Sequence, residues 1–146
     1  MSTLTLTRRI AFSAVHRYGR ADWSEARNAE AFGETSLREF HEHSYVCDVT
    51  VAGTVDQSTG MLVDLRVLDR VLQVSIVDRF NGRTLNRDIP QFADGKQVPT
   101  GENLASLIAA LVQSALDEQR GARVVVTAVT VAENPTLSAT WRASGV

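Results

Sequence analysis

Alternation of apolar and polar residues predicts two long strands in the first third of the chain. Residues 3–16 alternate, and the apolar positions end at His16. Residues 41–53 also alternate, with His41 and His43 on the same side as the apolar positions. Because successive side chains on a strand point to opposite faces, each segment is predicted to have one buried face and one exposed face.

Apolar residues spaced three and four positions apart predict two longer helices further along the chain. The first helix is capped by Asp64 and carries its apolar stripe as far as Ile76. The second is capped by Thr100 and ends before Gly121. A short helix with a serine cap is also expected over residues 24–32.

The last segment is predicted to be a hairpin, with strands at 123–133 and 137–141 around an Asn-Pro turn. The expected fold is therefore α+β: a single domain over residues 1–146, with a four-stranded antiparallel sheet and two helices on one face. Residues 124–132 are apolar at both odd and even positions. Two helices cover only one face, so this segment predicts a homo-oligomer in which other copies bury the second face.

The composition excludes several functional classes. Hydrophobic residues make up 44% of the 146 residues and the net charge is −2, so no basic surface for nucleic acid is expected. No apolar run approaches the ~18 residues of a membrane span, and residues 1–9 lack the apolar core of a signal peptide. Cys47 is the only cysteine, which excludes an internal disulfide. A cytoplasmic protein is expected.

The three histidines of the chain are placed where one metal ion could bind all of them. His41 and His43 are two residues apart, which sets them on one face of a strand about 6–7 Å apart. His16 ends the other alternating segment. Three histidine ligands would leave one position of a tetrahedral zinc open, as in catalytic sites. A His-x-His pair taken alone is more often an ordinary surface or core pair, so this interpretation depends on all three histidines.

Six short motifs in the same order resemble the 6-pyruvoyl-tetrahydropterin synthase family over nearly the whole chain. No single motif is specific, but six in register are. They are Phe12-Ser13-Ala14-Val15-His16-Arg17; Trp23-Ser24 with Asn28 and Phe32-Gly33; His41-x-His43-x-Tyr45; Thr59-Gly60-Met61 with Asp64; Pro99-Thr100-x-Glu102-Asn103; and Val131-x-Glu133.

The resemblance implies a tunnelling fold, in which trimers form a barrel and two trimers stack into a hexamer with sites between subunits. It also implies zinc at the three histidines and a pterin held by Glu133, with Thr100 and Glu102 as further candidates at the same rim. A pterin presents a ring N–H beside an exocyclic amine, and a carboxylate can accept both in a bidentate fork.

The sequence departs from the family at its acid–base residues. Thr35 occupies the position of the family's catalytic cysteine, and Asn81-Gly82 occupies that of its Asp-His pair, while a different gap would place Asp78-Arg79 there. Zinc would use every histidine of the chain, which leaves none to relay protons. The thiol of Cys47 is four residues beyond the His-x-His pair, about 13 Å along the strand, and is expected to be a buried small hydrophobe.

The expected function is therefore a zinc- and pterin-binding homologue of 6-pyruvoyl-tetrahydropterin synthase. We expect it to act on dihydroneopterin or its triphosphate by a lyase-type reaction, with the usual synthase activity weak or absent. One alternative is a catalytically silent pterin-binding protein. Another is an enzyme like 6-carboxy-tetrahydropterin synthase of 7-deazaguanine biosynthesis, which relies on the same missing residues.

Overall fold

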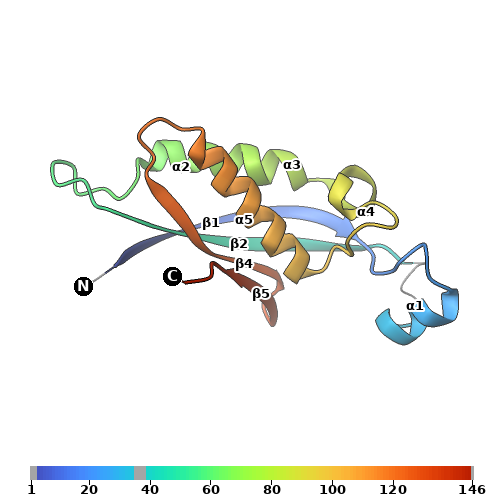
Figure 1. Cartoon of the computed structure of the whole chain (residues 1–146). Helices are drawn as coiled ribbons and strands as arrows, with labels where there is room; N and C mark the ends of the chain where they lie inside the picture. Colours follow the sequence, from blue (N-terminus) through green and yellow to red (C-terminus); the bar gives the residue numbers. More distant parts are fainter. Residues whose placement is uncertain (1–2, 35–38, 146) are drawn as a thin grey trace.

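The computed structural model describes residues 3–34 and 39–145, and its long elements follow the order that the sequence predicts (Figure 1). Short helical turns and one short strand are added between them. In chain order the elements are β1 (Leu4–His16), α1 (Glu25–Phe32), β2 (His41–Gly53), α2 (Leu65–Leu72), η1 (Gln73–Val77), α3 (Asp78–Phe80), β3 (Arg83–Thr84), α4 (Leu85–Asp88), η2 (Pro90–Phe92), α5 (Gly101–Asp117), β4 (Val124–Asn134) and β5 (Leu137–Arg142).

The sheet has the strand order β3-β1-β2-β4-β5. β1 and β2 pair antiparallel over their whole length, from Leu4 opposite Gly53 to His16 opposite His41. β4 pairs antiparallel with β2, and the hairpin strand β5 pairs antiparallel with β4. This register places the end of β1 beside the start of β2, which brings histidines from both strands to one end of the sheet.

The prediction of four strands was wrong by one. The additional strand, β3, has only two residues, which pair in parallel with Ala14 and Val15 of β1. Two residues cannot show the alternation that marks a strand in a sequence. The side chain of Asn81 supports this edge, because its Oδ1 accepts a hydrogen bond from the Ser13 N–H at 2.9 Å.

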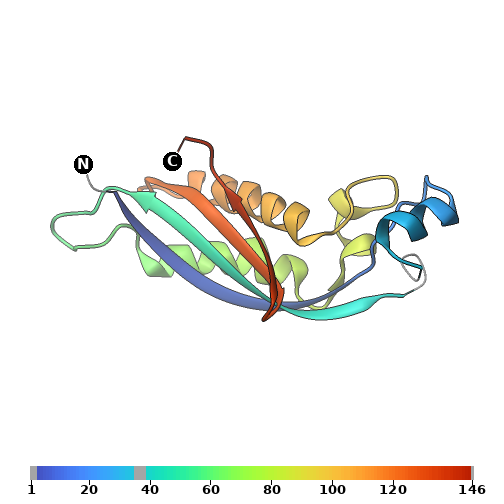
Figure 2. The same ribbon diagram turned by 90° about the horizontal axis from the view of Figure 1, so that it is seen from below.

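The two predicted helices are present and pack on one face of the sheet (Figures 1 and 2). Asp64 caps α2 by accepting from the Arg66 N–H, and Thr100 caps α5 by accepting from the Asn103 N–H. The first helix continues beyond α2 as a π-helical turn, η1, and a last α-turn, α3. Neither α5 nor any other helix within residues 3–34 and 39–145 is long and apolar enough to cross a bilayer.

The core lies between these helices and the sheet. Burying each large apolar side chain contributes about 1.5–3 kcal/mol relative to leaving it exposed, so this layer supplies most of the stability. The fully buried residues that helices and strands contribute include Leu68, Leu72, Ile76, Leu104, Ile108, Leu116, Tyr45, Val49 and Val51.

The segment between the two long helical regions, residues 81–98, contains the short turns α4 and η2. Leu85, Ile89 and Phe92 in these turns are buried and anchor the segment to the core. Turns of three and four residues are too short for a helical period to appear in the sequence. The short helix α1 agrees with its prediction, with Ser24 accepting from the Arg27 N–H and Gly33 following at a φ of 101°.

No helix within residues 3–34 and 39–145 covers the second face of the sheet (Figure 2). The prediction that β4 is apolar on both faces is only partly confirmed. Val125 is 54% exposed on β4, but hydroxyl pairs also lie along this part of the sheet, with Thr130 and Thr140 joined at 2.8 Å. The homo-oligomer expected from this face stays a prediction.

Candidate metal and ligand site

The predicted histidines meet at the end of the sheet where β1 finishes and β2 begins. His16 is the register partner of His41, and His43 lies diagonally across the strand pair. Diagonal neighbours on one face of a sheet lie within reach of long side chains. The ring centroids of His16 and His43 are 4.8 Å apart, and those of His41 and His43 are 6.5 Å apart.

Glu133 on β4 joins this histidine cluster. Its Oε1 lies 3.3 Å from His16 Nε2 and 3.7 Å from His43 Nε2. One ligand atom from each of these three residues lies within 4.8 Å of the others, and no other such group occurs in the described part of the chain. His41 is more exposed and falls outside this closest group. The structure thus brings His16 and His43 together as predicted. It also places the Glu133 carboxylate beside them, whereas the resemblance implied that Glu133 binds the pterin.

The hydrogen bonds of His16 leave one ring nitrogen available to a metal. Nδ1 lies 3.1 Å from the Pro99 carbonyl oxygen and 2.9 Å from the Tyr45 hydroxyl. Because a carbonyl can only accept, we assign the proton of the neutral ring to Nδ1, which leaves a lone pair on Nε2. A second partner that fixes the tautomer in this way is typical of metal-ligating histidines.

Burial keeps His16 neutral. Its side chain is only 3% exposed, and this burial, with the neighbouring charge of His43, lowers the pKa of His16 to about 4. A neutral Nε2 then faces a carboxylate oxygen, so two electron-rich atoms lie 3.3 Å apart. Ligand atoms at 2.0–2.1 Å from a tetrahedral zinc lie roughly 3.4 Å apart, so His16 and Glu133 are spaced as two ligands of one divalent cation would be.

A cavity of about 250 Å³ adjoins the cluster. It brings together the three residues that the sequence argument selected for ligand binding: Glu133, Thr100 and Glu102. Two acidic side chains and one hydroxyl in a small, partly apolar cavity favour a ligand with several N–H or O–H donors. Its other lining residues are Tyr18, Gly101, Val131, Leu137, Ser138 and Ala139.

Tyr18 is a site residue that the sequence argument missed. Its hydroxyl donates to Glu133 Oε1 at 3.2 Å. Burial, followed by the negative charge of Glu133, raises the pKa of Tyr18 well above its ordinary value, so the phenol stays protonated. The spacing of two residues from His16 to Tyr18 was a weak signal, because Tyr18 lies beyond the end of the strand.

The thiol of Cys47 has no place in this site. Its side chain is completely buried on β2, opposite Ile10 and Val131 of the neighbouring strands. Burial raises the pKa of Cys47 to about 12, so the thiolate is absent at neutral pH. The expectation of a buried small hydrophobe is confirmed.

Of the two residues at the family's catalytic positions, Thr35 and Asn81, the structure describes only Asn81. Thr35 lies outside the described residues. Asn81 does not line the 250 Å³ cavity, and its amide oxygen is used by the Ser13 N–H. Asp78, the alternative under a different gap, accepts a hydrogen bond from Gln73 at 2.8 Å.

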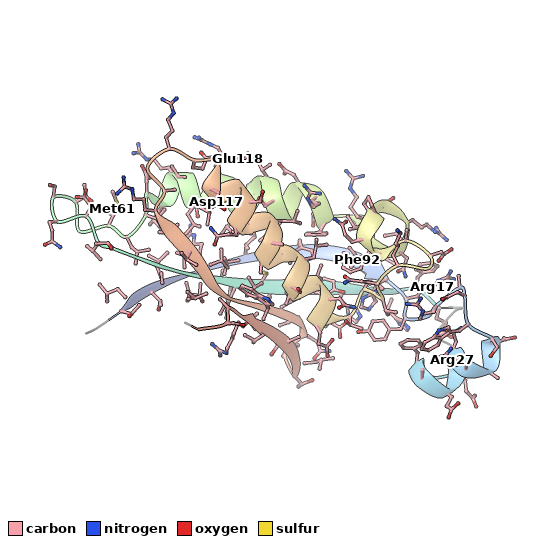
Figure 3. All side chains as sticks on the ribbon, viewed as in Figure 1. Arg17, Arg27, Met61, Phe92, Asp117 and Glu118 are labelled. Carbon is pink, nitrogen blue, oxygen red and sulfur yellow. The ribbon has the colours of Figure 1, made fainter. Side chains whose placement is uncertain are left out.

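Arginines surround the α1 end of the molecule, where Arg17 and Arg27 project at the opposite end from Met61 (Figure 3). The guanidinium of Arg17 lies 4.9 Å from the Phe40 ring, next to His41 in sequence, and that of Arg27 lies 3.7 Å from the Trp23 ring. These cation–π contacts hold both guanidinium groups against aromatic side chains.

Residues 5–144 match the model of the family described as 6-pyruvoyl tetrahydropterin synthase. The human protein named 6-pyruvoyl tetrahydrobiopterin synthase is 37% identical over 103 residues, which cover 70% of this chain and 70% of that protein. A protein of the same name from Drosophila melanogaster is also 37% identical over 103 residues, which cover 70% of this chain and 60% of that protein.

Solved structures show the same fold. The 6-pyruvoyl tetrahydropterin synthase of Caenorhabditis elegans superimposes with a TM-score of 0.86 at 31% identity, covering 99% of this chain and 98% of that one. The Plasmodium vivax enzyme superimposes with a TM-score of 0.68 at 14% identity over 98% of this chain and 99% of that one, a likeness of fold alone. This is the predicted tunnelling fold. The chain belongs to the 6-pyruvoyl tetrahydropterin synthase family, a family of lyases that typically depend on a divalent metal.

Proposed function

We propose that the chain binds zinc and a dihydropterin at the end of the sheet formed by β1, β2 and β4. One observation carries this proposal: the Nε2 atoms of His16 and His43 converge with Glu133 beside a cavity of about 250 Å³. Zinc would be held by His16, His41 and His43, with Glu133 left for the pterin. When bound, the ion would supply Lewis-acid polarisation of oxygen atoms on the ligand's side chain.

Glu133 suits recognition of the pterin ring. Its side chain is 8% exposed, and a buried carboxylate is costly unless hydrogen-bond donors or a cation compensate it. A pterin supplies two adjacent N–H donors that fit the two oxygens of one carboxylate. Glu102 and Thr100 line the same cavity and can accept further donors of the ligand.

The proposed reaction follows from which side chains are available to transfer protons. His16 has its Nδ1 engaged by Pro99 and its Nε2 turned toward Glu133, and the thiol of Cys47 is remote and protonated. General acid–base groups contribute about 10²–10⁴-fold each, so a site without the usual ones should catalyse the synthase reaction weakly or not at all. We propose a lyase-type reaction on dihydroneopterin or its triphosphate by another route. The full proposal includes a hexamer of two stacked trimers and a cytoplasmic location.

Turnover tests this proposal against its alternatives. The zinc-loaded protein is incubated with dihydroneopterin and, separately, with its triphosphate, and products are separated by chromatography. A new pterin product from either substrate supports a lyase. Tight binding without any product favours a silent pterin-binding protein, and formation of 6-carboxy-tetrahydropterin favours the 7-deazaguanine pathway. The relatives in human and Drosophila are named as synthases. Full synthase activity in this protein would contradict the proposed weakness of the usual reaction.

A further inference from the structure

Tyr18 connects the histidine cluster to the cavity. It lies two residues beyond the end of β1, and its ring centroid lies 4.9 Å from that of His16 and 6.3 Å from that of Phe32 on α1. Its hydroxyl reaches β4, where it donates to Glu133 Oε1 at 3.2 Å. One side chain thus touches three separate elements, which restricts the directions that its hydroxyl can take.

The two oxygens of Glu133 are used differently. Oε1 accepts from Tyr18 and faces the Nε2 atoms of His16 and His43. Oε2 makes no hydrogen bond with residues 3–34 or 39–145, and it is not among the buried polar atoms that lack a partner. Since Glu133 lines the cavity, Oε2 is the oxygen left for a ligand.

A carboxylate held at one oxygen has a defined plane. The terminal torsion of a glutamate is otherwise broad, so the plane of a free carboxylate is poorly fixed. Each ionised oxygen offers two acceptor positions, so Oε1 can keep the Tyr18 hydroxyl and still accept a second donor. A ligand with two adjacent N–H groups would then meet both oxygens in a plane set before it arrives.

We propose that Tyr18 is a positioning residue that orients the Glu133 carboxylate and thereby selects ligands that present two adjacent N–H donors. The inference rests on the proposed pterin-binding function and adds a determinant of specificity to it. Fixing a binding group in advance reduces the ordering cost of binding. The benefit is largest for a ligand that uses both oxygens, because the second hydrogen bond depends most strongly on the carboxylate plane.

The test compares two ligands on the zinc-loaded protein. Pterin carries the 2-amino group, whereas lumazine carries a carbonyl oxygen in its place and cannot donate there. The variant Tyr18→Phe keeps the ring contacts with His16 and Phe32 but removes the hydroxyl. We expect it to bind pterin about tenfold more weakly, near the lower end of the effect of one hydrogen bond to a charged group. Lumazine affinity should change less than about twofold, because lumazine gains little from the second oxygen.

Thr130→Val is the matched control for loss of a hydroxyl, because Thr130 pairs with Thr140 and neither residue lines the 250 Å³ cavity. It should leave both affinities unchanged, and all three proteins should be folded and contain the same amount of zinc. A double variant, Tyr18→Phe with Glu133→Gln, should bind pterin no more weakly than Glu133→Gln alone, since Tyr18 acts through Glu133.

The inference would be overturned if Tyr18→Phe bound pterin as tightly as wild type does, or if it lost affinity for pterin and lumazine equally. The proposed function would still stand in either case. Wild-type protein that binds no pterin would overturn the proposed function, and the inference with it. A selective loss for pterin that disappears in the Glu133→Gln background would establish the positioning role.

Discussion

Oε1 of Glu133 lies 3.3 Å from Nε2 of His16, and this contact joins the metal-binding and ligand-binding parts of the site. The carboxylate can therefore serve the cation or the pterin. The proposed assignment gives the cation to the three histidines and the pterin to Glu133, and each residue can be tested separately.

Zinc content distinguishes two candidate sets of zinc-binding residues. One is the three histidines, and the other is His16, His43 and Glu133. We expect His41→Ala to lose stoichiometric zinc, because His41 supplies the third ligand in the proposed set. Glu133→Gln should retain one zinc per chain, since glutamine preserves the shape of the side chain without its charge. The measurement is metal analysis of each purified variant. The reverse pattern, with zinc kept in His41→Ala and lost in Glu133→Gln, would assign the metal to His16, His43 and Glu133.

His16 should make the metal-free protein less stable in mild acid. The folded state holds the pKa of His16 at about 4, below the ordinary value of 6.5, so the unfolded chain binds this proton more tightly. The contribution of neutral His16 to the free energy of unfolding is complete above pH 6.5. It is lost as the pH falls through 4, and the total loss is about 3 kcal/mol. Urea unfolding of metal-free protein at several pH values measures it.

The control for this pH effect is His16→Gln, which has no titrating group at the position. Its free energy of unfolding should fall less steeply between pH 6.5 and 4 than that of wild type. An identical slope in both proteins would show that other groups govern the acid sensitivity.

Cys47 should be inert toward thiol reagents in the folded protein. The side chain is fully buried and its pKa is raised to about 12, so both access and thiolate are lacking. A colorimetric disulfide reagent should label the native protein only at the rate of global unfolding, while the protein in urea reacts at once. Rapid labelling of the native state would place a reactive thiol near the surface and reopen it as a candidate base.

Thr100 has two roles, and one pair of variants tests its role as a helix cap. Its hydroxyl caps α5 by accepting from the Asn103 N–H, and it also lines the cavity. Thr100→Ala should lower the free energy of unfolding by about 1 kcal/mol, whereas Thr100→Ser keeps the cap and should change it little. Equal stability of both variants, measured by urea unfolding, would mean that the cap contributes nothing.

Much of this site was predictable because it is built on strands. The period of two set His41 and His43 on one face of a strand and ended another strand at His16, and the pairing of His16 with His41 brings these strand ends together. The same period could have included Tyr18, but a residue just past a strand end has no fixed direction in sequence. The contact of Glu133 with the histidines depends on the register between β2 and β4, which alternation alone does not determine.

The short elements were not predictable for a different reason. β3 has two residues and α4 has four, so neither shows a period. Their positions follow from tertiary contacts, such as the hydrogen bond from Ser13 to Asn81 and the burial of Leu85. The residue at the family's cysteine position, Thr35, lies outside the described residues, so its role stays a prediction.

Titration of pterin into the zinc-loaded protein, compared between wild type and Glu133→Gln, tests the central claim most directly. We predict saturable binding to wild type and a loss of at least about 1.5 kcal/mol in the variant, the lower range for a hydrogen bond to a charged group. Equal affinities, or no binding by the wild type, would contradict a pterin site at Glu133.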